Sequence, residues 1–336
     1  MFLQLSPPLS RVGLAIAALT LTGTAFGQEP GGAVIQQSAH PYVRVDRMLT
    51  GSDTAWELHL LQTTDEIYLS VGVRKPEGDG PFPVILIGSG NGIDGMGKIE
   101  RSMVRFRELM GRLVERGYVA VFVSYRNEVP EAYNEFEQAE LVADNVSGGS
   151  RTLRSVPALD SDDHLAIIEH VKGLPYTDSE AVGAIGSSHS GEIIMKTVTR
   201  GVGLLTAAVP SEAAVTEYLV VDTSNAPRDE SGSELQLRTA NYVRTIADKE
   251  RAMARLRQIE TPLLILGRDD DHLQGMFRLL YEWADEAGAD VTWRSFDHPE
   301  HGFSLLGRPQ GERFVNHPLE EEAFELYMAF FDKHLR

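Results

Sequence analysis

The residue best placed to do chemistry is Ser188, which lies in the run G-S-S-H-S-G at residues 186–191. This run follows an apolar segment, residues 181–185, and precedes a helical pattern. A nucleophile elbow needs such a context, because a strand must reverse into a helix and hold one serine in a strained conformation with its hydroxyl exposed. Gly186 and Ser190, two positions either side of Ser188, are small enough to permit that turn. We therefore predict Ser188 as a nucleophile.

The run departs from the usual G-x-S-x-G pattern, because Ser190 replaces the second glycine and Gly191 follows it. Ser187 and Ser190 are alternative nucleophiles, but each has a bulky residue, Ile185 or Glu192, two positions away. A turn that merely caps the next helix is the structural alternative.

A serine hydroxyl is a poor nucleophile at neutral pH, so it needs a base, and a carboxylate must orient that base. An apolar run, residues 263–266, leads through Gly267 into three consecutive acids. We predict Asp270 as the orienting carboxylate, with Asp271 and then Asp269 as alternatives. Acids clustered on a loop are more often solvated, and these lack the alternating spacing and glycine of an EF-hand calcium loop.

The predicted base is His301, in the run D-H-P-E-H-G-F at residues 297–303, which follows the apolar run at residues 291–296. The stretch between the acid loop and His301 is long enough for one helix and one strand. His298 and His272 are the alternatives. A lone loop histidine is usually a polar surface residue, and the chain order serine, acid, histidine is what favours His301.

Acyl transfer also needs donors for the developing oxyanion. The run G-S-G-N-G at residues 88–92 follows an apolar segment, and its glycines let main-chain N–H groups turn toward a ligand. We predict the N–H of Ser89 or Gly90, together with that of His189, as these donors. A phosphate-binding loop is disfavoured because no Gly-Lys-Ser/Thr follows.

Apolar runs and helical patterns alternate along the chain, which predicts a three-layer α/β/α sandwich with a mostly parallel sheet and an antiparallel hairpin at its N-terminal end. The hairpin is expected at residues 56–63 and 66–74. Parallel strands are expected at residues 84–87, 119–123, 181–185, 204–209, 263–266 and 291–296, and helices at about 103–113, 160–172, 190 onward, 273–287 and 318 onward.

Two segments stand outside this rhythm. Residues 213–258 form a long insertion, polar at first and helical over 240–258, which we interpret as a cap over a pocket, with a surface excursion as the alternative. Residues 1–27 combine Arg11, an apolar run and a small-residue end, which predicts a cleavable signal peptide. An uncleaved anchor is the alternative, although the run is short for a bilayer span. Residues 28–54 are expected to be an N-terminal extension, and residues 55–336 the folded domain.

Composition narrows the classes of function. The formal net charge of −18, from 49 acidic and 31 basic side chains, would repel a phosphate backbone and argues against nucleic-acid binding. The chain has no cysteine, which excludes thiol nucleophiles, disulfides and cysteine metal sites. The predicted chemistry needs no metal and no organic cofactor.

Taken in order, these motifs resemble the α/β-hydrolase superfamily, and within it the branch of dienelactone-hydrolase-like esterases and prolyl-oligopeptidase-like peptidases. The resemblance covers residues 55–335 and includes the elbow, the G-R-D-D-D-H-L run at 267–273 and the H-G-F run at 301–303. Dienelactone hydrolases proper use a cysteine, so the resemblance here implies a serine esterase.

The implied partner is a small or lipid-like acyl ester, in a secreted or periplasmic protein without a membrane span once the leader is cleaved. The oligomeric state is not predicted. A peptidase or amidase with the same triad is the second hypothesis, and a secreted binding protein with an impaired site, suggested by Ser190, is the third. The few residues before the fold favour the esterase, since they leave no room for a β-propeller.

Overall fold

The computed structural model describes residues 36–37, 43–48, 55–62, 68–90, 95–125, 159–232, 234–305, 308–310, 313–315 and 317–336. Every described residue belongs to the second of the chain's two units, Val34–Arg336. The predicted signal peptide and most of the predicted extension lie outside the described residues. Within the described residues, the helices are too short or too polar to cross a bilayer.

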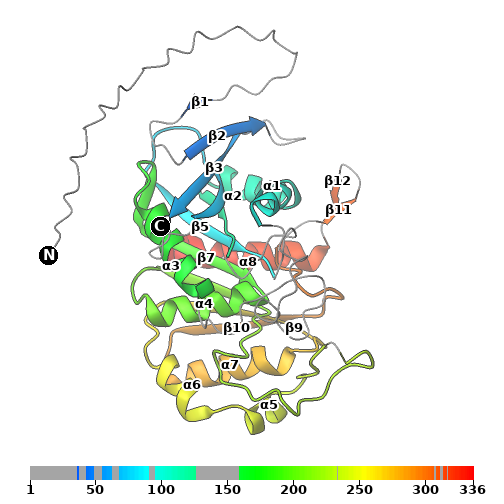
Figure 1. The fold of residues 1–336 in the computed structure, drawn as a ribbon. Coiled ribbons are helices and arrows are strands. Elements are labelled where there is room, and N and C mark those ends of the chain that lie inside the picture. The colour runs from blue at the N-terminus through cyan, green and yellow to red at the C-terminus, as the bar shows by residue number, and fades with distance from the viewer. Residues whose placement is uncertain are drawn as a thin grey trace, which may run out of the picture. The chain divides into compact units, whose positions relative to one another are not determined.

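A ten-stranded mixed sheet forms the centre of the second unit, with the strand order β1-β2-β3-β4-β6-β5-β7-β8-β9-β10 (Figure 1). The strands are β1 (Gln36–Gln37), β2 (Val43–Met48), β3 (Ala55–Gln62), β4 (Tyr68–Arg74), β5 (Phe82–Gly88), β6 (Val119–Phe122), β7 (Thr177–Ser187), β8 (Ala207–Ser211), β9 (Leu263–Arg268) and β10 (Val291–Phe296). A separate pair, β11 (Arg308–Gln310) and β12 (Arg313–Val315), completes the strands.

The sheet is parallel from β6 to β10 and antiparallel from β1 to β6. All six predicted parallel strands and the predicted hairpin are confirmed. β1 and β2 fall within the predicted extension, residues 28–54, yet they continue the sheet beyond the hairpin. The first four residues of β2, V-R-V-D, alternate apolar and polar residues, which is a pattern typical of a strand.

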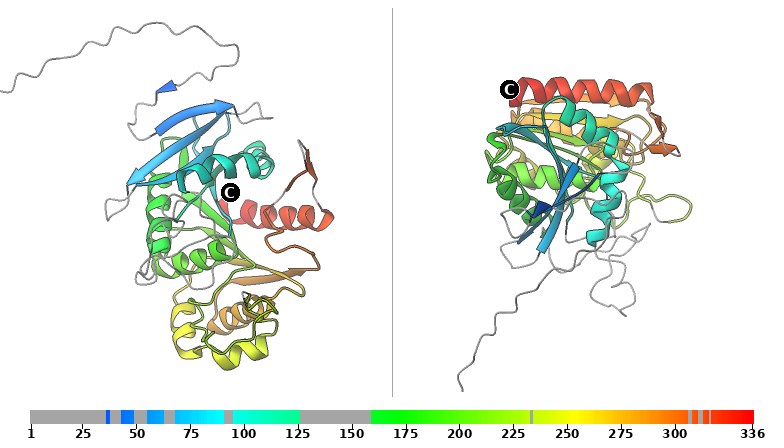
Figure 2. Two further views of the ribbon diagram at one scale, coloured as in Figure 1. Left: turned by 45° about the vertical axis from the view of Figure 1, so that its right-hand side comes forward. Right: turned by 90° about the horizontal axis from the view of Figure 1, so that it is seen from above.

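Helices cover both faces of the sheet, as predicted (Figure 2). Successive residues of β5 point to opposite sides, so that Val84 and Leu86 join one buried cluster and Ile85 and Ile87 join the other. The first cluster includes side chains of α3 (Leu159–Lys172), α4 (His189–Arg200), α5 (Ala240–Ile246), α6 (Lys249–Leu256) and α7 (Gln274–Ala287), and the second includes those of α1 (Gly95–Arg105), α2 (Arg107–Glu115) and α8 (Pro318–Leu335).

Two predicted helices are each broken once. The helix expected at residues 103–113 is divided at Phe106, whose backbone leaves the helical region (φ −100°, ψ 18°). In the insertion, α5 and α6 are separated by the extended Ala247 (φ −102°, ψ 146°). Thr239 and Asp248 cap the two helices by accepting from backbone N–H groups at their first turns.

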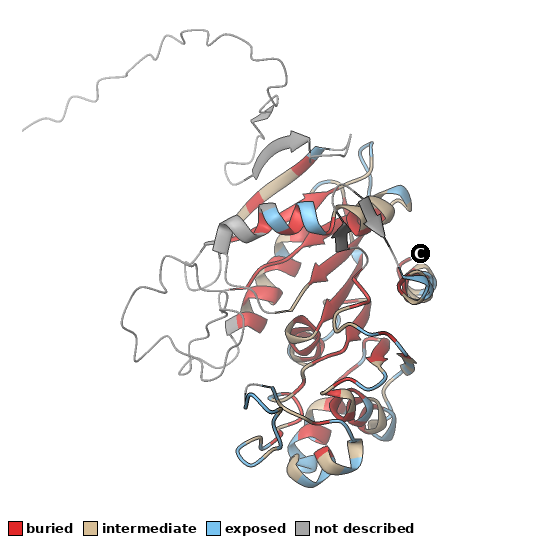
Figure 3. Cartoon of the chain, turned by 90° about the vertical axis from the view of Figure 1, so that its right-hand side faces the viewer, coloured by how far each residue is buried: buried red, intermediate tan, exposed pale blue. Residues whose placement is uncertain are grey.

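The insertion packs against α7 at the β9 side of the sheet, and its buried residues extend the core there (Figure 3). Val243, Ala252 and Leu256 are fully buried in this region. The helical part of the insertion therefore belongs to the α layer of the domain. Its role as a cap stays a prediction.

Candidate active site

Ser188 lies at the turn between β7 and α4 and has a backbone conformation that residues with a side chain rarely adopt (φ 56°, ψ −117°). Hydrogen bonds hold it there. Its N–H donates to the carbonyl of Ser211 (3.0 Å), and its own carbonyl accepts from the N–H groups of Glu192 (3.2 Å) and Ala214 (3.0 Å). The strain and its support are the features that the sequence predicts for a nucleophile elbow.

The elbow can close only because glycines stand where backbones meet. A Cβ on Gly186 would lie 2.7 Å from the carbonyl carbon of Ser190, and one on Gly191 would lie 2.7 Å from Cβ of Ala213. Both distances are shorter than real Cβ contacts allow. Gly191 therefore permits the close packing of α4 against the residues after β8.

Ser190 fills the space beside Gly88 and links the elbow to the loop after β5. Its hydroxyl donates to the backbone carbonyl of Ser89, and its side chain is completely buried. Ser187 is buried as well, at 2% exposure, whereas Ser188 is partly exposed. The structure therefore favours Ser188 over both alternative serines.

Ser188 and His301 line one cavity of about 250 Å³. Its walls come from the loop after β5, the junction of α1 and α2, the residues that follow His301, and the start of α8. None of the described residues of the insertion at 213–258 lines this cavity. The lining consists of Ser89, Gly90, Arg105, Phe106, Ser187, Ser188, His301, Gly302, Phe303, Leu305 and Glu320.

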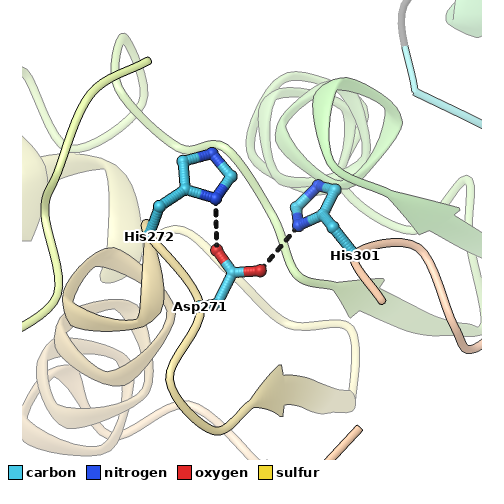
Figure 4. Close-up of side chains that lie close together, drawn as sticks. All are labelled: Asp271, His272 and His301. Carbon is cyan, nitrogen blue, oxygen red and sulfur yellow. Dashed lines mark hydrogen bonds and ion pairs between the residues drawn. The ribbon is translucent and has the colours of Figure 1, made fainter. Parts of the chain in front are cut away.

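The carboxylate beside His301 is that of Asp271, whose Oδ2 lies 2.8 Å from Nδ1 of the imidazole (Figure 4). A carboxylate only accepts, so Nδ1 carries the hydrogen and Nε2 is left to take a proton. Asp271 is fully buried and also accepts from the N–H of Leu273 (2.7 Å) and from Nε of Arg268 (2.9 Å). Nδ1 of His272 lies 3.1 Å from its second oxygen.

The prediction of Asp270 as the orienting acid is corrected by this geometry. Asp270 is exposed, and its backbone lies in the left-handed region (φ 59°). That turn directs the next side chain, Asp271, inward beneath His301. The carbonyl of Asp270 accepts from Arg238 (2.7 Å), while the carboxylate of Asp269 accepts from Ser295. Asp271, the first alternative, is the acid whose carboxylate contacts His301.

Asp271 and His301 each shift the pKa of the other. Burial alone would raise the pKa of Asp271, but hydrogen bonds from His272 and His301 lower it well below the usual range. Burial alone would lower the pKa of His301, but the hydrogen bond that His301 donates to Asp271 and the charge of Glu212 outweigh burial and raise it above the usual imidazole value.

Glu212 is a second carboxylate at His301 that sequence reasoning missed. It follows β8 directly, is fully buried, and places Oε1 3.5 Å from Nδ1 of His301. Its other oxygen accepts from the N–H of Gly302 (2.8 Å). Burial raises its pKa to about 7. The available signal was an acid at the carboxyl end of the strand beside the elbow strand.

The two alternative bases lie elsewhere. His298 is buried, stacks on Phe303, and places Nε2 3.5 Å from Glu320. His272 shares Asp271 with His301, and their ring centroids lie 5.5 Å apart. Neither is among the residues that line the cavity.

The predicted oxyanion donors surround Ser188. Ser89 and Gly90 line the cavity, and a Cβ on Gly90 would lie 3.7 Å from that of Ser188. His189 begins α4, while its side chain turns to the buried Asp160 (Nε2–Oδ2 3.1 Å). The rest of the predicted glycine-rich loop, residues 91–92, lies outside the described residues. The donor roles themselves stay predictions.

Three of these residues also form a group that could hold a metal ion. Asp271, His272 and His301 offer ligand atoms within 4.8 Å of one another, and they form the one such group in the described ranges. Both imidazole Nδ1 atoms, however, lie at hydrogen-bonding distance from the two oxygens of Asp271. The geometry is that of one carboxylate shared by two imidazoles, and a cofactor-free site stays a prediction.

No family model matches the sequence, and no curated protein is similar enough in sequence to be matched. Solved structures do match. Dipeptidyl peptidase 4 of Porphyromonas gingivalis is 18% identical, with a TM-score of 0.55 over 84% of this chain and 36% of that one. A Rhizomucor miehei esterase is 15% identical, with a TM-score of 0.55 over 83% of both chains.

A Klebsiella pneumoniae protein assigned as a dienelactone hydrolase is 14% identical, with a TM-score of 0.50 over 83% of this chain and 99% of that one. The chain thus spans about a third of the peptidase but most of the esterase. At such identities the likeness concerns the fold. Together with the sheet order and the elbow, these matches show that the chain has the α/β-hydrolase fold.

Proposed function

We propose that this chain is a serine hydrolase that cleaves carboxylic ester bonds through an acyl-enzyme intermediate. The observation that carries the proposal is the convergence of a strained Ser188 and His301 on one cavity, with His301 oriented by the buried Asp271. Such a constellation activates a hydroxyl that is otherwise unreactive at neutral pH.

The reaction follows from these positions. Nε2 of His301 takes the hydroxyl proton as Oγ of Ser188 attacks the ester carbonyl carbon, and the main-chain N–H of Ser89 or Gly90 binds the oxyanion together with that of His189. The imidazolium then protonates the departing alcohol as its C–O bond breaks. Water, deprotonated by the same imidazole, attacks the acyl-enzyme and releases the acid, and the proton returns to Ser188.

Esters are proposed over peptides because the Rhizomucor miehei esterase is matched over 83% of its length, whereas the peptidase is matched over 36%. The peptidase match keeps amide hydrolysis by the same triad as the second candidate. Initial rates on p-nitrophenyl acyl esters and on aminoacyl anilides separate the two, and faster turnover of the anilides would reverse the order.

Covalent labelling tests the chemistry itself. A fluorophosphonate probe should modify the wild-type chain at Ser188, as located by peptide mapping, and Ser188→Ala should abolish both labelling and turnover. Ser190→Ala serves as the matched control, because it removes the neighbouring hydroxyl and should keep labelling at residue 188. Labelling of Ser188→Ala would reassign the nucleophile, and an unreactive wild type would favour the non-catalytic binding protein.

Secretion or export to a periplasm, with removal of residues 1–27, is the accompanying proposal. It rests on the composition of the leader alone. Mass spectrometry of the protein recovered outside the cytoplasm should give Gln28 as the first residue. A chain that keeps its leader in the membrane fraction would support the uncleaved anchor.

A further inference from the structure

The negative charge that Asp271 presents to His301 is partly offset, because the guanidinium of Arg268 contacts the same carboxylate oxygen. Nε and Nη2 of Arg268 lie 2.9 Å and 2.8 Å from Oδ2 of Asp271, the atom that also meets Nδ1 of His301. An opposite charge at this distance offsets much of the carboxylate's field at the imidazole. Asp271 orients the base, but Arg268 weakens its ability to stabilise an imidazolium.

Glu212 supplies a second negative charge at the same nitrogen. Its Oε1 lies 3.5 Å from Nδ1 of His301 and 3.7 Å from Nε of Arg268, and this oxygen is buried and has no hydrogen-bond partner among the described residues. Burying a carboxylate in such a position is costly unless a positive charge forms beside it. The imidazolium of the reaction is such a charge.

The charges balance when His301 is protonated. Two carboxylates, Asp271 and Glu212, and one guanidinium, Arg268, leave one net negative charge, which a single imidazolium cancels. Among the described residues, the titratable side chain of His272 also faces this cluster. Arg105 and Glu320 lie further along the walls of the cavity.

We propose that Glu212 is a positioning residue. It holds the His301 loop through Gly302, and its negative charge near Nδ1 compensates for the positive charge of Arg268, which offsets that of Asp271. This inference rests on the proposed function, because it assigns Glu212 a part in forming the imidazolium. The raised pKa of Glu212, about 7, supports it, since proton uptake by His301 and ionisation of Glu212 then fall in one pH range.

The first test is Glu212→Gln. The glutamine keeps an oxygen that can accept from the N–H of Gly302, and it removes the charge. We expect the rate of fluorophosphonate labelling at Ser188 to fall about tenfold, and the acid limb of its pH profile to move about one unit lower, because His301 loses a proton more readily without the second carboxylate. A purely structural role for Glu212 would lower the rate without moving that limb.

The matched control is Glu57→Gln. Glu57 lies on β3 with Oε2 2.7 Å from Nε2 of the buried His59, so the variant also removes a carboxylate beside a buried imidazole, away from the cavity. Its acid limb should coincide with that of the wild type. An unchanged limb and rate in Glu212→Gln would overturn the inference while leaving the proposed function intact.

The double variant Glu212→Gln/Asp271→Asn tests whether both carboxylates act on Nδ1 of His301. In the Asp271→Asn background, Glu212 is the remaining carboxylate at Nδ1, so Glu212→Gln should cost more than tenfold there. A second substitution without effect in that background would contradict the proposal.

A measurement on the wild type covers the case in which the variants do not fold. The imidazole of His301, followed by NMR as a function of pH, should titrate in two steps, because its proton affinity depends on the ionisation of Glu212. A single-step curve would overturn the coupling. This readout needs no turnover, so an unreactive wild type with a two-step curve would count against the proposed function rather than against the pairing of Glu212 with His301.

Discussion

Nδ1 of His301 lies 2.8 Å from Oδ2 of Asp271, and Asp271 is completely buried beneath the imidazole. The preceding residue in the chain, Asp270, is an acid of the same kind that faces solvent. The adjacent pair therefore provides its own control, since the two side chains have the same chemistry and differ in their contact with the base.

Asp271→Asn should lower kcat on p-nitrophenyl esters by about 10³- to 10⁴-fold, because an amide at this position no longer selects the tautomer that leaves Nε2 able to accept a proton. Asp270→Asn should stay within about twofold of the wild type, because its side chain is exposed. Steady-state rates of both purified variants check the assignment. The reverse order of effects would restore Asp270 as the acid.

Activity should decline as the medium becomes more acidic. Only neutral His301 can take the proton of Ser188, and the pKa of His301 is raised above 6.5 by Asp271 and Glu212. The acid limb of kcat/KM should therefore lie at higher pH than that of an unperturbed imidazole. A rate independent of pH between 5 and 8 would remove His301 from the role of base.

Stability should respond to Glu212 with a defined sign. The folded state raises its pKa from 4.5 to about 7, so between these values the folded chain holds a proton that the unfolded chain has released, and its contribution to stability is lost as the pH rises. The free energy of unfolding of Glu212→Gln, relative to that of the wild type, should therefore increase by on the order of 3 kcal/mol from pH 5 to pH 8. Urea unfolding at both pH values measures the difference. A gap that is equal at the two pH values would contradict a buried, titrating Glu212.

The elbow should tolerate no side chain at Gly186. Gly186→Ala places a Cβ 2.7 Å from the carbonyl carbon of Ser190, which should cost about 2–4 kcal/mol in the free energy of unfolding and suppress labelling of Ser188. Gly111→Ala is the control, because Gly111 lies inside α2 and a Cβ there would be 3.6 Å from Nη1 of Arg74, so the free energy of unfolding should rise by up to about 1 kcal/mol. Thermal unfolding of both variants tests the contrast, and a stable, reactive Gly186→Ala would refute the steric argument.

The sequence predicted the sheet well because its strands are continuous apolar runs between helical patterns. The strands at 84–87 and 263–266 are buried on both faces, and such strands are recognised in a sequence as unbroken apolar runs. The break at Phe106 was not predicted, because one apolar periodicity continues across it and only packing in three dimensions divides the helix.

The site was predicted where local sequence determines the backbone, and missed where one residue of register decides it. Ser188 was predicted from small residues at fixed spacing, and its backbone has the strained conformation that an elbow requires. Among three consecutive acids, however, the turn at Asp270 selects which carboxylate points inward, and spacing from Gly267 could not reveal a positive φ. Glu212 was missed because its partner, His301, is distant in sequence and becomes a neighbour only in the folded sheet.

The short turn at the end of β8, residues 211–214, contacts both Ser188 and the loop that carries His301. Ser211 and Ala214 fix the backbone of Ser188, and Glu212 between them reaches the loop of His301. Residues 211–214 thus hold both the proposed nucleophile and the loop of the proposed base, although Ser188 and His301 are far apart in the sequence. A substitution that shifts residues 211–214 would displace Ser188 and His301 together. Its effect on activity should therefore resemble the loss of both side chains.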